Sequence, residues 1–322
     1  MNRKEEYLFR GEVKRKVDSF KEYLKKQRLN ENTTGQKSNY TGFYLLWIEG
    51  ERLGEENTRY NDLLNFIDYC YLEGKTKGHI NRILWAIRDY YEYLKLSRPE
   101  IKNPARNLHI KATRQKVITG VTPIEELETL YQEYPSGSHR GKRNRIMLGL
   151  LVYQGITTEE MKQLEPTHLK LKEGKIRIPG SRRRNGRILE LKPFQVLELH
   201  EYLTETRRVI LDEITTPKPA RKPDKINKTR IESQLFISIN GSENIKNSLW
   251  HLFREIKKTH PEITSAEQIR KSVIVNWLKD HNLREVQYMA GHKYVSSTER
   301  YQMNHLENLK TKIEKYHPLN IQ

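Results

Sequence analysis

The chain has 322 residues, of which 35% are hydrophobic and 31% charged, and its formal net charge is +18 at pH 7. This excess of Lys and Arg favours a polyanionic partner, with nucleic acid preferred to an anionic membrane surface. The alternative is a basic surface that is simply solvated and has no such partner. The single cysteine, Cys70, excludes an internal disulfide framework and a cysteine metal cluster, and no apolar run is long enough to cross a membrane. We therefore expect no cysteine metal site and no membrane insertion.

Periodic apolar residues in the first hundred positions predict a bundle of helices. Val17, Phe20 and Leu24 recur at spacings of three and four, which places them on one face of a helix over 12–30. The same periodicity predicts a second helix to about residue 49, capped by Asn32 or Thr33, and further helices over 60–73 and 77–96. We interpret these stripes as core packing. Residues 12–107 are thus predicted to form an all-α domain after an N-terminal extension, 1–11.

A basic stretch without helical periodicity, 108–120, is predicted to be a linker, after which residues 121–304 form a mixed domain. "RNRIMLGLLVYQG" (143–155) predicts a buried helix, and "GKIRIPGSRRRNGRILELKP" (174–193) predicts two strands around an Arg-rich turn. A short strand and a turn are predicted over 234–241, and helices over 245–259, 264–280 and 283–290. The predicted fold class is two domains: an all-α bundle followed by a mixed, mainly α domain with a small antiparallel β-sheet.

The stretch "MAGHKYVSSTERYQ" (289–302) places a histidine nine residues before a tyrosine. On one straight helix His292 and Tyr301 would face opposite sides. Gly291 is a natural end for the preceding helix, and Ser296 with Glu299 forms the S-x-x-E pattern that begins a new one. We therefore expect a break between His292 and Ser296, where a turn can bring the imidazole and the phenol to one site.

These residues resemble the motifs of the tyrosine recombinases, the phage-integrase-like family. The resemblance is carried by Arg270, "SVIVNWL", "VQYMAGH" and Tyr301, and in the first domain by "TKGHINRILWAIRDYYEYL" followed by "NPA". It covers residues 12–305 and implies a SAM-like core-binding domain before a catalytic domain. It also implies a site-specific DNA recombinase that uses neither metal nor cofactor and acts in the cytoplasm, associated with the nucleoid.

The resemblance implies a role for each of three side chains. Tyr301 would attack the scissile phosphate and form a 3′-phosphotyrosyl bond, His292 would donate a hydrogen bond to a phosphate oxygen, and Arg270 would hold the phosphate with two parallel bonds. The alternatives are a packing role for the tyrosine, a structural histidine and a solvated arginine.

Three positions depart from the family pattern. Thr157 stands where the family has its first arginine, and Glu267 stands where it has a histidine. The lysine of the family's hairpin falls in "GSRRRNGR", which contains Arg182, Arg183 and Arg184 but no lysine. Some mobile-element relatives also lack the first arginine. The missing charge could come from arginines elsewhere, namely Arg182–Arg184, Arg143 or Arg145.

Three functions therefore stay open: an active recombinase with a substitute arginine, a catalytically inactive DNA-binding protein with the same fold, and a nicking-and-closing enzyme. Candidate DNA contacts, each with a solvated-surface alternative, are Lys75, Lys77, His79 and Arg82 in the first domain and Arg183 and Arg184 in the hairpin.

An apolar stripe follows Tyr301, in the tail 305–322. It predicts a helix that packs on its own domain or, as the resemblance implies, docks on a neighbouring subunit of a DNA-bound tetramer.

Overall fold

The computed structural model describes residues 11–111, 120–216 and 228–302. The chain forms two compact units, Met1–Lys116 and Val117–Gln322. The predicted tail helix at 305–322, the N-terminal extension up to residue 10 and most of the predicted linker lie outside the described residues.

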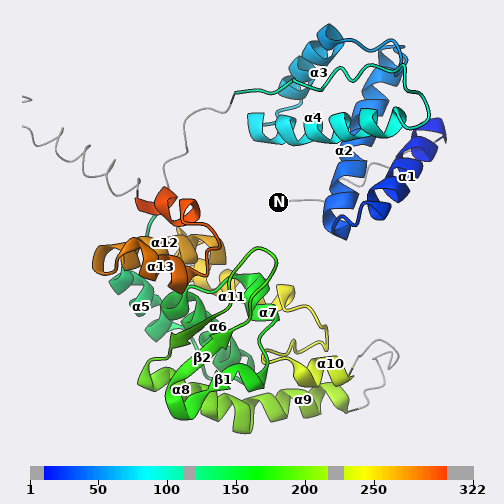
Figure 1. Ribbon diagram of the computed structural model, residues 1–322. Coiled ribbons are helices and arrows are strands. Elements are labelled where there is room, and N and C mark those ends of the chain that lie inside the picture. The colour runs from blue at the N-terminus through cyan, green and yellow to red at the C-terminus, as the bar shows by residue number, and fades with distance from the viewer. Residues whose placement is uncertain (1–10, 112–119, 217–227, 303–322) are drawn as a thin grey trace, which may run out of the picture. The chain divides into compact units, whose positions relative to one another are not determined.

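The described part of the first unit is helical, as predicted (Figure 1). Its helices are α1 (Gly11–Lys26), α2 (Glu31–Gly50), α3 (Tyr60–Leu72) and α4 (Lys77–Leu94). The predicted cap of the second helix was wrong: Asn30 is the cap, and its side chain accepts a hydrogen bond from the Asn32 N–H at 2.9 Å. The β-region backbone of Asn30 leaves its side-chain oxygen free to turn back to that first-turn N–H.

Aromatic rings fill the core of this unit. Phe66 on α3 is fully buried, and its ring centroid lies 5.2 Å from that of Trp47 and 5.4 Å from that of Tyr44, both on α2. Large rings bury much apolar surface and make edge-to-face contacts, so α2 and α3 are joined through one continuous aromatic cluster.

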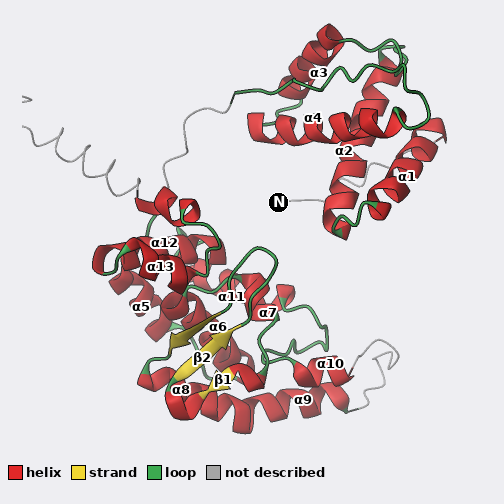
Figure 2. Ribbon diagram, viewed as in Figure 1, coloured by secondary structure: helices red, strands yellow, loops and turns green. Residues whose placement is uncertain are grey.

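The second unit is mainly helical with one small sheet (Figure 2). The sheet is antiparallel with order β1-β2-β3, formed by β1 (Leu169–Lys170), β2 (Lys175–Ile178) and β3 (Arg187–Glu190). The predicted hairpin of 174–193 thus forms β2 and β3. The helices before and after the sheet are α5 (Ile124–Glu133), α6 (His139–Gln154), α7 (Thr158–Lys162), α8 (Pro193–Glu201), η3 (Tyr202–Thr206), α9 (Arg207–Thr215), α10 (Lys228–Ser233), α11 (Lys246–Thr259), α12 (Ala266–Asp280) and α13 (Leu283–Ala290). Two short 3₁₀ turns, η1 (Pro166–His168) and η2 (Leu171–Glu173), flank β1.

Helix α6 is the buried centre of the second unit, as its unbroken apolar run predicts. It packs against α5, α8, α9, α11 and α12. No strand forms over 234–241, so that part of the prediction was wrong, whereas the turn predicted in the same segment is present at residues 239–240. Leu235, Phe236 and Ile237 are buried nevertheless, and a short apolar run can be buried without joining a sheet.

The break predicted after His292 is present. Gly291 ends α13 with a positive φ of 65°, and a new helix runs over the described residues 296–302. No described helix has the length and apolarity that crossing a membrane requires.

Replacing Phe66 by Ala should destabilise the first unit by about 3–5 kcal/mol, because the cavity would lie at the centre of the aromatic cluster. Hydrogen exchange followed by mass spectrometry should show faster exchange in α2 and α3 and unchanged exchange in α12. Leu72→Ala is the matched control, since Leu72 lies on the same helix and is 87% exposed. Equal exchange rates in the two variants would contradict this account of the core.

Candidate active site

The site is built on the end of α13. Gly291 adopts a left-handed conformation that reverses the chain, so His292 leaves the helix axis at once. The backbone N–H of His292 donates to the Gln287 carbonyl at 3.0 Å, and the Gln287 side chain donates to the His292 carbonyl at 3.2 Å. These two bonds hold the histidine backbone against the last turn of α13.

Polar groups from elsewhere hold the same turn. Arg187 on β3 donates through Nε to the Met289 carbonyl at 2.7 Å, and Arg270 on α12 donates through Nη2 to the Ala290 carbonyl. The backbone N–H of Asn185 donates to the Gly291 carbonyl at 3.1 Å. The carbonyl groups that end α13 are thus bonded by the hairpin and by α12, which fixes the position of the residue that follows.

Arg270 lies inside the protein and is 4% exposed. Its Nη1 donates to the carbonyl of Gly155, which ends α6, so one guanidinium joins the C-terminal ends of two helices. These ends carry partial negative charge and partly compensate the cation. Burial, and next the charge of Arg184, lower the pKa of Arg270 to about 9, against the opposing effect of Glu160.

A buried ion pair between Arg187 and Glu160 lies next to this cluster. Nη1 and Nη2 of Arg187 donate to the two carboxylate oxygens of Glu160 at 2.6 and 3.3 Å. Thr157 caps α7 and donates to Glu160 through its backbone N–H at 2.8 Å and its hydroxyl at 2.9 Å. Although burial raises the pKa of Glu160, the hydrogen bond and charge of Arg187 hold it below the ordinary 4.5. Glu160 is therefore an ionised carboxylate fully engaged by its neighbours.

The imidazole of His292 is buried between two polar partners. Nδ1 lies 2.8 Å from the hydroxyl of Thr298, and Nε2 lies 3.3 Å from Nη2 of Arg270. Burial, followed by the positive charges of the surrounding arginines, lowers the pKa of His292 to about 4. The ring is therefore neutral at pH 7. Because an arginine can only donate, Nε2 accepts from Arg270 and Nδ1 carries the hydrogen.

Tyr301 lies beside this histidine. The two rings are stacked, with centroids 6.0 Å apart and an interplanar angle of 18°. The tyrosine also packs on a small apolar cluster of α12 and α13 around Ile274 and Val286. The new helix after residue 295 thus returns the phenol to the imidazole, which resolves the opposite-face geometry of a single straight helix.

The β2–β3 hairpin brings one of its consecutive arginines to the same place. The turn is closed by backbone bonds between Ser181 and Arg184, at 2.9 and 3.3 Å, so Arg182 and Arg183 form its exposed tip. Arg184 forms a backbone bridge with His292, and its Nη1 is buried without a hydrogen-bond partner among the described residues.

Positive charge is in excess around His292. Burial apart, the groups that shift its pKa are Arg270, Arg184 and Arg187, which lower it, and Glu160, which raises it. Three guanidinium groups therefore face one carboxylate, and that carboxylate is already engaged by Arg187. In a site of low exposure, uncompensated cations favour binding of an anion. No cluster of three or more metal-ligating side chains occurs within the described residues.

Two predicted site residues add no positive charge to the cluster. Glu267 is exposed in the first turn of α12 and pairs with Lys271 at 3.0 Å. Thr157 borders the site through Glu160 but brings no positive charge. Of the candidate substitute arginines, Arg143 is buried and donates to the Ile237 carbonyl at 2.7 Å, and Arg145 pairs with Glu198 at 3.1 Å, so both are engaged outside the cluster.

The candidate DNA contacts of the first unit lie at the start of α4. Lys77 and Arg82 are exposed, whereas Lys75 and His79 are half-buried. The Lys75 ammonium lies 4.9 Å from the centroid of the Phe43 ring. The four residues gather at one end of the helix and offer a basic surface.

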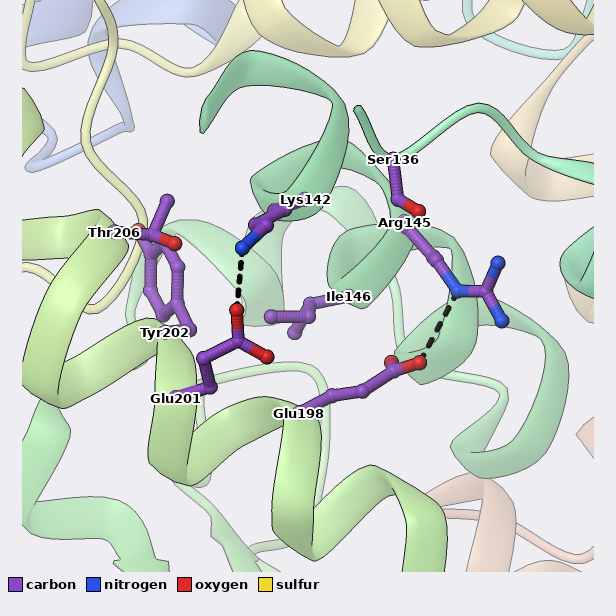
Figure 3. A pocket seen from close by; sticks show the side chains of 8 residues that line it. All are labelled: Ser136, Lys142, Arg145, Ile146, Glu198, Glu201, Tyr202 and Thr206. Atoms are coloured by element: carbon purple, nitrogen blue, oxygen red, sulfur yellow. Dashed lines mark hydrogen bonds and ion pairs between the residues drawn. The ribbon is translucent and has the colours of Figure 1, made fainter. Parts of the chain in front are cut away.

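A separate pocket lies between α6, α8 and η3 (Figure 3). Its charged side chains face one another: Lys142 pairs with Glu201, and Arg145 pairs with Glu198 at 3.1 Å. Because these charges compensate each other, the pocket offers no unpaired charge to a ligand, unlike the cluster around His292.

Sequence reasoning missed Arg187, Glu160 and Thr298 as members of the site. Arg187 could have been placed facing inward, because it alternates with the buried Leu189 along β3. Glu160 had a local signal, because Thr157 and Glu160 form the T-x-x-E pattern of a capping box, and the structure forms that box. Thr298 had none, since its hydroxyl meets His292 only through the turn that precedes the last described helix.

With this geometry the chain belongs to the phage integrase family, whose model matches residues 121–319, more than half of its length. It is similar to tyrosine recombinase XerD of Chlorobaculum tepidum, with 24% identity over 314 residues covering 94% of this chain and 96% of that protein. Tyrosine recombinase XerC of Staphylococcus carnosus is 23% identical over 268 residues, covering 81% and 82%. The family is therefore that of the tyrosine recombinases, as the motifs predicted.

Solved structures share the fold. XerH site-specific recombinase bound to palindromic difH substrate has a TM-score of 0.69 and 18% identity, covering 92% of this chain and 83% of that chain. The Tn1549 transposon integrase with circular intermediate DNA has a TM-score of 0.61 and 16% identity, covering 88% and 94%. The predicted fold class is thus confirmed.

Gly291→Ala should destabilise the protein by roughly 2–4 kcal/mol, from a left-handed alanine and a steric clash. The added Cβ would lie 2.4 Å from Nη1 of Arg187, which cannot move away without breaking its buried pair with Glu160. Gly174→Ala is the matched control, because Gly174 has a φ of 63° with open space around it. Urea denaturation of both variants measures the difference. Equal losses would mean that the contact with Arg187 contributes nothing.

The depressed pKa of His292 predicts a pH-dependent contribution to stability. The unfolded chain binds more protons at this group between pH 6.5 and about pH 4, so the contribution is present above pH 6.5 and lost as pH falls through that window. In this range the wild type should lose up to about 3 kcal/mol more than His292→Gln. Urea denaturation at several pH values measures this, with the exposed His200→Gln as control. Parallel curves for wild type and His292→Gln would contradict the assignment.

Proposed function

We propose that this protein is a site-specific DNA recombinase that cuts and rejoins DNA through a covalent 3′-phosphotyrosyl bond to Tyr301. The observation that carries the proposal is the assembly of Tyr301, His292 and Arg270 in one positively charged cluster. These side chains come from three separate segments of the chain. Packing alone does not require that a phenol stack on an imidazole beside a guanidinium group that has no carboxylate partner of its own among the described residues.

The reaction conserves the phosphodiester energy. Tyr301 Oη loses its proton and forms a bond to the scissile phosphorus, while the bond from phosphorus to the 5′ oxygen breaks and that oxygen is protonated as a free hydroxyl. A second 5′-hydroxyl then attacks the phosphotyrosyl bond and releases Tyr301. Covalent storage of the bond makes an external energy source unnecessary.

The surrounding cations would stabilise the charge of the transition state. In the unliganded site Arg270 donates to Nε2 of His292. A phosphate oxygen that takes over this hydrogen bond would free Nε2, raise the pKa of the imidazole and let His292 donate to the same anion. The phosphate would thereby relieve the charge repulsion that, together with the larger effect of burial, lowers the pKa of both residues.

DNA binding would use both units. The contacts proposed are those of the α4 end and the hairpin tip, namely Lys75, Lys77, His79, Arg82, Arg182 and Arg183. Arg182, where the family has its hairpin lysine, would reach the DNA beside the cut. Each phosphate neutralised should steepen the dependence of log affinity on log salt by about 0.9.

Complete exchange between two duplexes requires four cuts and therefore four copies of Tyr301. We accordingly propose a homotetramer on double-stranded DNA of the nucleoid, with residues 305–322 of each copy docking on a neighbour. Thr157 in place of the first arginine favours a mobile-element role, in integration or transposition, because some mobile-element relatives share that loss.

A second candidate is a catalytically inactive DNA-binding protein with the same fold. It is favoured by Glu267, which is exposed and paired with Lys271, and by Thr157, whose hydroxyl is bound to Glu160. Neither side chain supplies a hydrogen-bond donor to a phosphate at the site. Loss of one such donor typically costs about 10²–10³ in rate.

Incubation with a nicked suicide substrate should give an adduct resistant to SDS, formed by wild type and absent in Tyr301→Phe. The substrate would be the DNA that flanks the protein's own gene and that the protein binds specifically. Tyr294→Phe is the control, since Tyr294 is 67% exposed and seven residues before Tyr301.

No adduct on DNA that is bound specifically would favour the inactive DNA-binding protein. An adduct without exchange between two intact sites would indicate nicking and closing. Both outcomes would overturn the recombinase proposal.

A further inference from the structure

The hydrogen bonds and ion pairs of the site do not explain why the side chain of Arg184 is partly buried there. Its Nη1 is buried without a hydrogen-bond partner among the described residues, although its backbone is fixed by a bridge to His292 and by the closed turn with Ser181. A buried donor without a partner costs free energy, and a charged one costs more. The backbone of Arg184 is therefore held in place, while no described side chain or carbonyl group pairs with its Nη1.

The hairpin is held in a way that aims this residue inward. A Cβ at Gly180 would lie 2.9 Å from the backbone nitrogen of Gly186, so the two glycines let the strands approach closely at the neck of the turn. Beyond the neck, Asn185 is bonded to Gly291. Arg184 thus turns toward His292, whereas Arg182 and Arg183 remain exposed at the tip.

The other two arginines of the cluster are already engaged. Arg187 uses Nε for Met289 and both terminal nitrogens for Glu160. Arg270 uses Nη1 for Gly155 and Nη2 for Ala290 and the imidazole of His292.

Arg184 therefore has the buried guanidinium nitrogen that is free to bind an anion. Its charge is also close enough to disfavour the protonated forms of Arg270 and His292.

We propose that Arg184 is a catalytic residue whose Nη1 binds a non-bridging oxygen of the scissile phosphate, and this inference rests on the proposed recombinase function. It supplies from the hairpin the positive charge that Thr157 does not supply from the start of α7. The anion pairs Nη1 and compensates the guanidinium groups that repel one another in the unliganded site. An arginine that points inward from the β2–β3 hairpin would thus replace the charge that is missing at Thr157 and allow activity.

The first test measures anion binding without DNA. Thermal unfolding of the full-length wild type should shift to higher temperature with inorganic phosphate, compared with chloride at equal ionic strength. Arg184→Gln should lose most of this shift and should be no less stable than wild type without phosphate, because it removes the buried Nη1 that has no partner among the described residues. Arg177→Gln, which removes an exposed arginine from β2 of the same sheet, should keep the shift.

The second test measures covalent chemistry. On the suicide substrate at saturating protein, Arg184→Gln should form the adduct about 10²–10³-fold more slowly than wild type while its DNA affinity changes less than threefold. Arg184→Lys should recover part of the rate, because it restores the charge without the planar fork. Arg177→Gln should react as wild type does.

The two tests separate failure of the inference from failure of the proposed function. An adduct formed equally fast by wild type and Arg184→Gln would overturn the role of Arg184 and leave the recombinase proposal standing. Absence of an adduct from wild type would overturn the recombinase function and with it the catalytic role. In that case loss of the phosphate shift in Arg184→Gln would still assign Arg184 to anion binding, and an unchanged shift would overturn that assignment too.

Discussion

The rest of the site depends on the buried guanidinium of Arg270. From α12 it donates to the carbonyl groups of Gly155 and Ala290, which end α6 and α13. Helix C-termini carry partial negative charge, so dipoles compensate this cation where a carboxylate would otherwise be expected. The contact joins three helices and places His292, which follows α13 directly. Because dipoles compensate only partly, the contact that builds the site also leaves it positively charged.

This excess of charge has opposite consequences for stability and for function. Burial, and after it the neighbouring arginines, lower the pKa of both His292 and Arg270, so these cations disfavour one another's protonated forms. In a folded protein without ligand, such repulsion only lowers the stability of the folded state. A protein that must bind a phosphate and stabilise additional charge in a transition state benefits, because its cations are already in position when the anion arrives. Membership of the tyrosine recombinases agrees with this reading.

Part of the site could be predicted from local sequence. Gly291 ends α13 because only a residue that tolerates positive φ fits there, and the helix that follows returns Tyr301 to His292. The pair of Glu160 and Arg187 could not be predicted, because its members are 27 residues apart and meet only when the hairpin packs on α7. Glu267 is the opposite case, because its spacing from Arg270 suggests the site, whereas in the first turn of α12 its side chain is exposed and pairs with Lys271.

The sequence by itself determined most of the helices, the hairpin, the break after His292 and the preference for a polyanion, because periodicity, capping, glycine conformation and net charge are local or additive properties. The 234–241 segment marks the limit of that reasoning, since a short apolar run predicts that its residues are buried but not whether they form a strand. Only the tertiary structure decided which arginine of the hairpin turns inward. Arg182, Arg183 and Arg184 are chemically identical, and Arg184 differs because Asn185 is bonded to Gly291 while Arg184 itself bridges to His292. That choice depends on contacts more than a hundred residues apart, which no local pattern encodes.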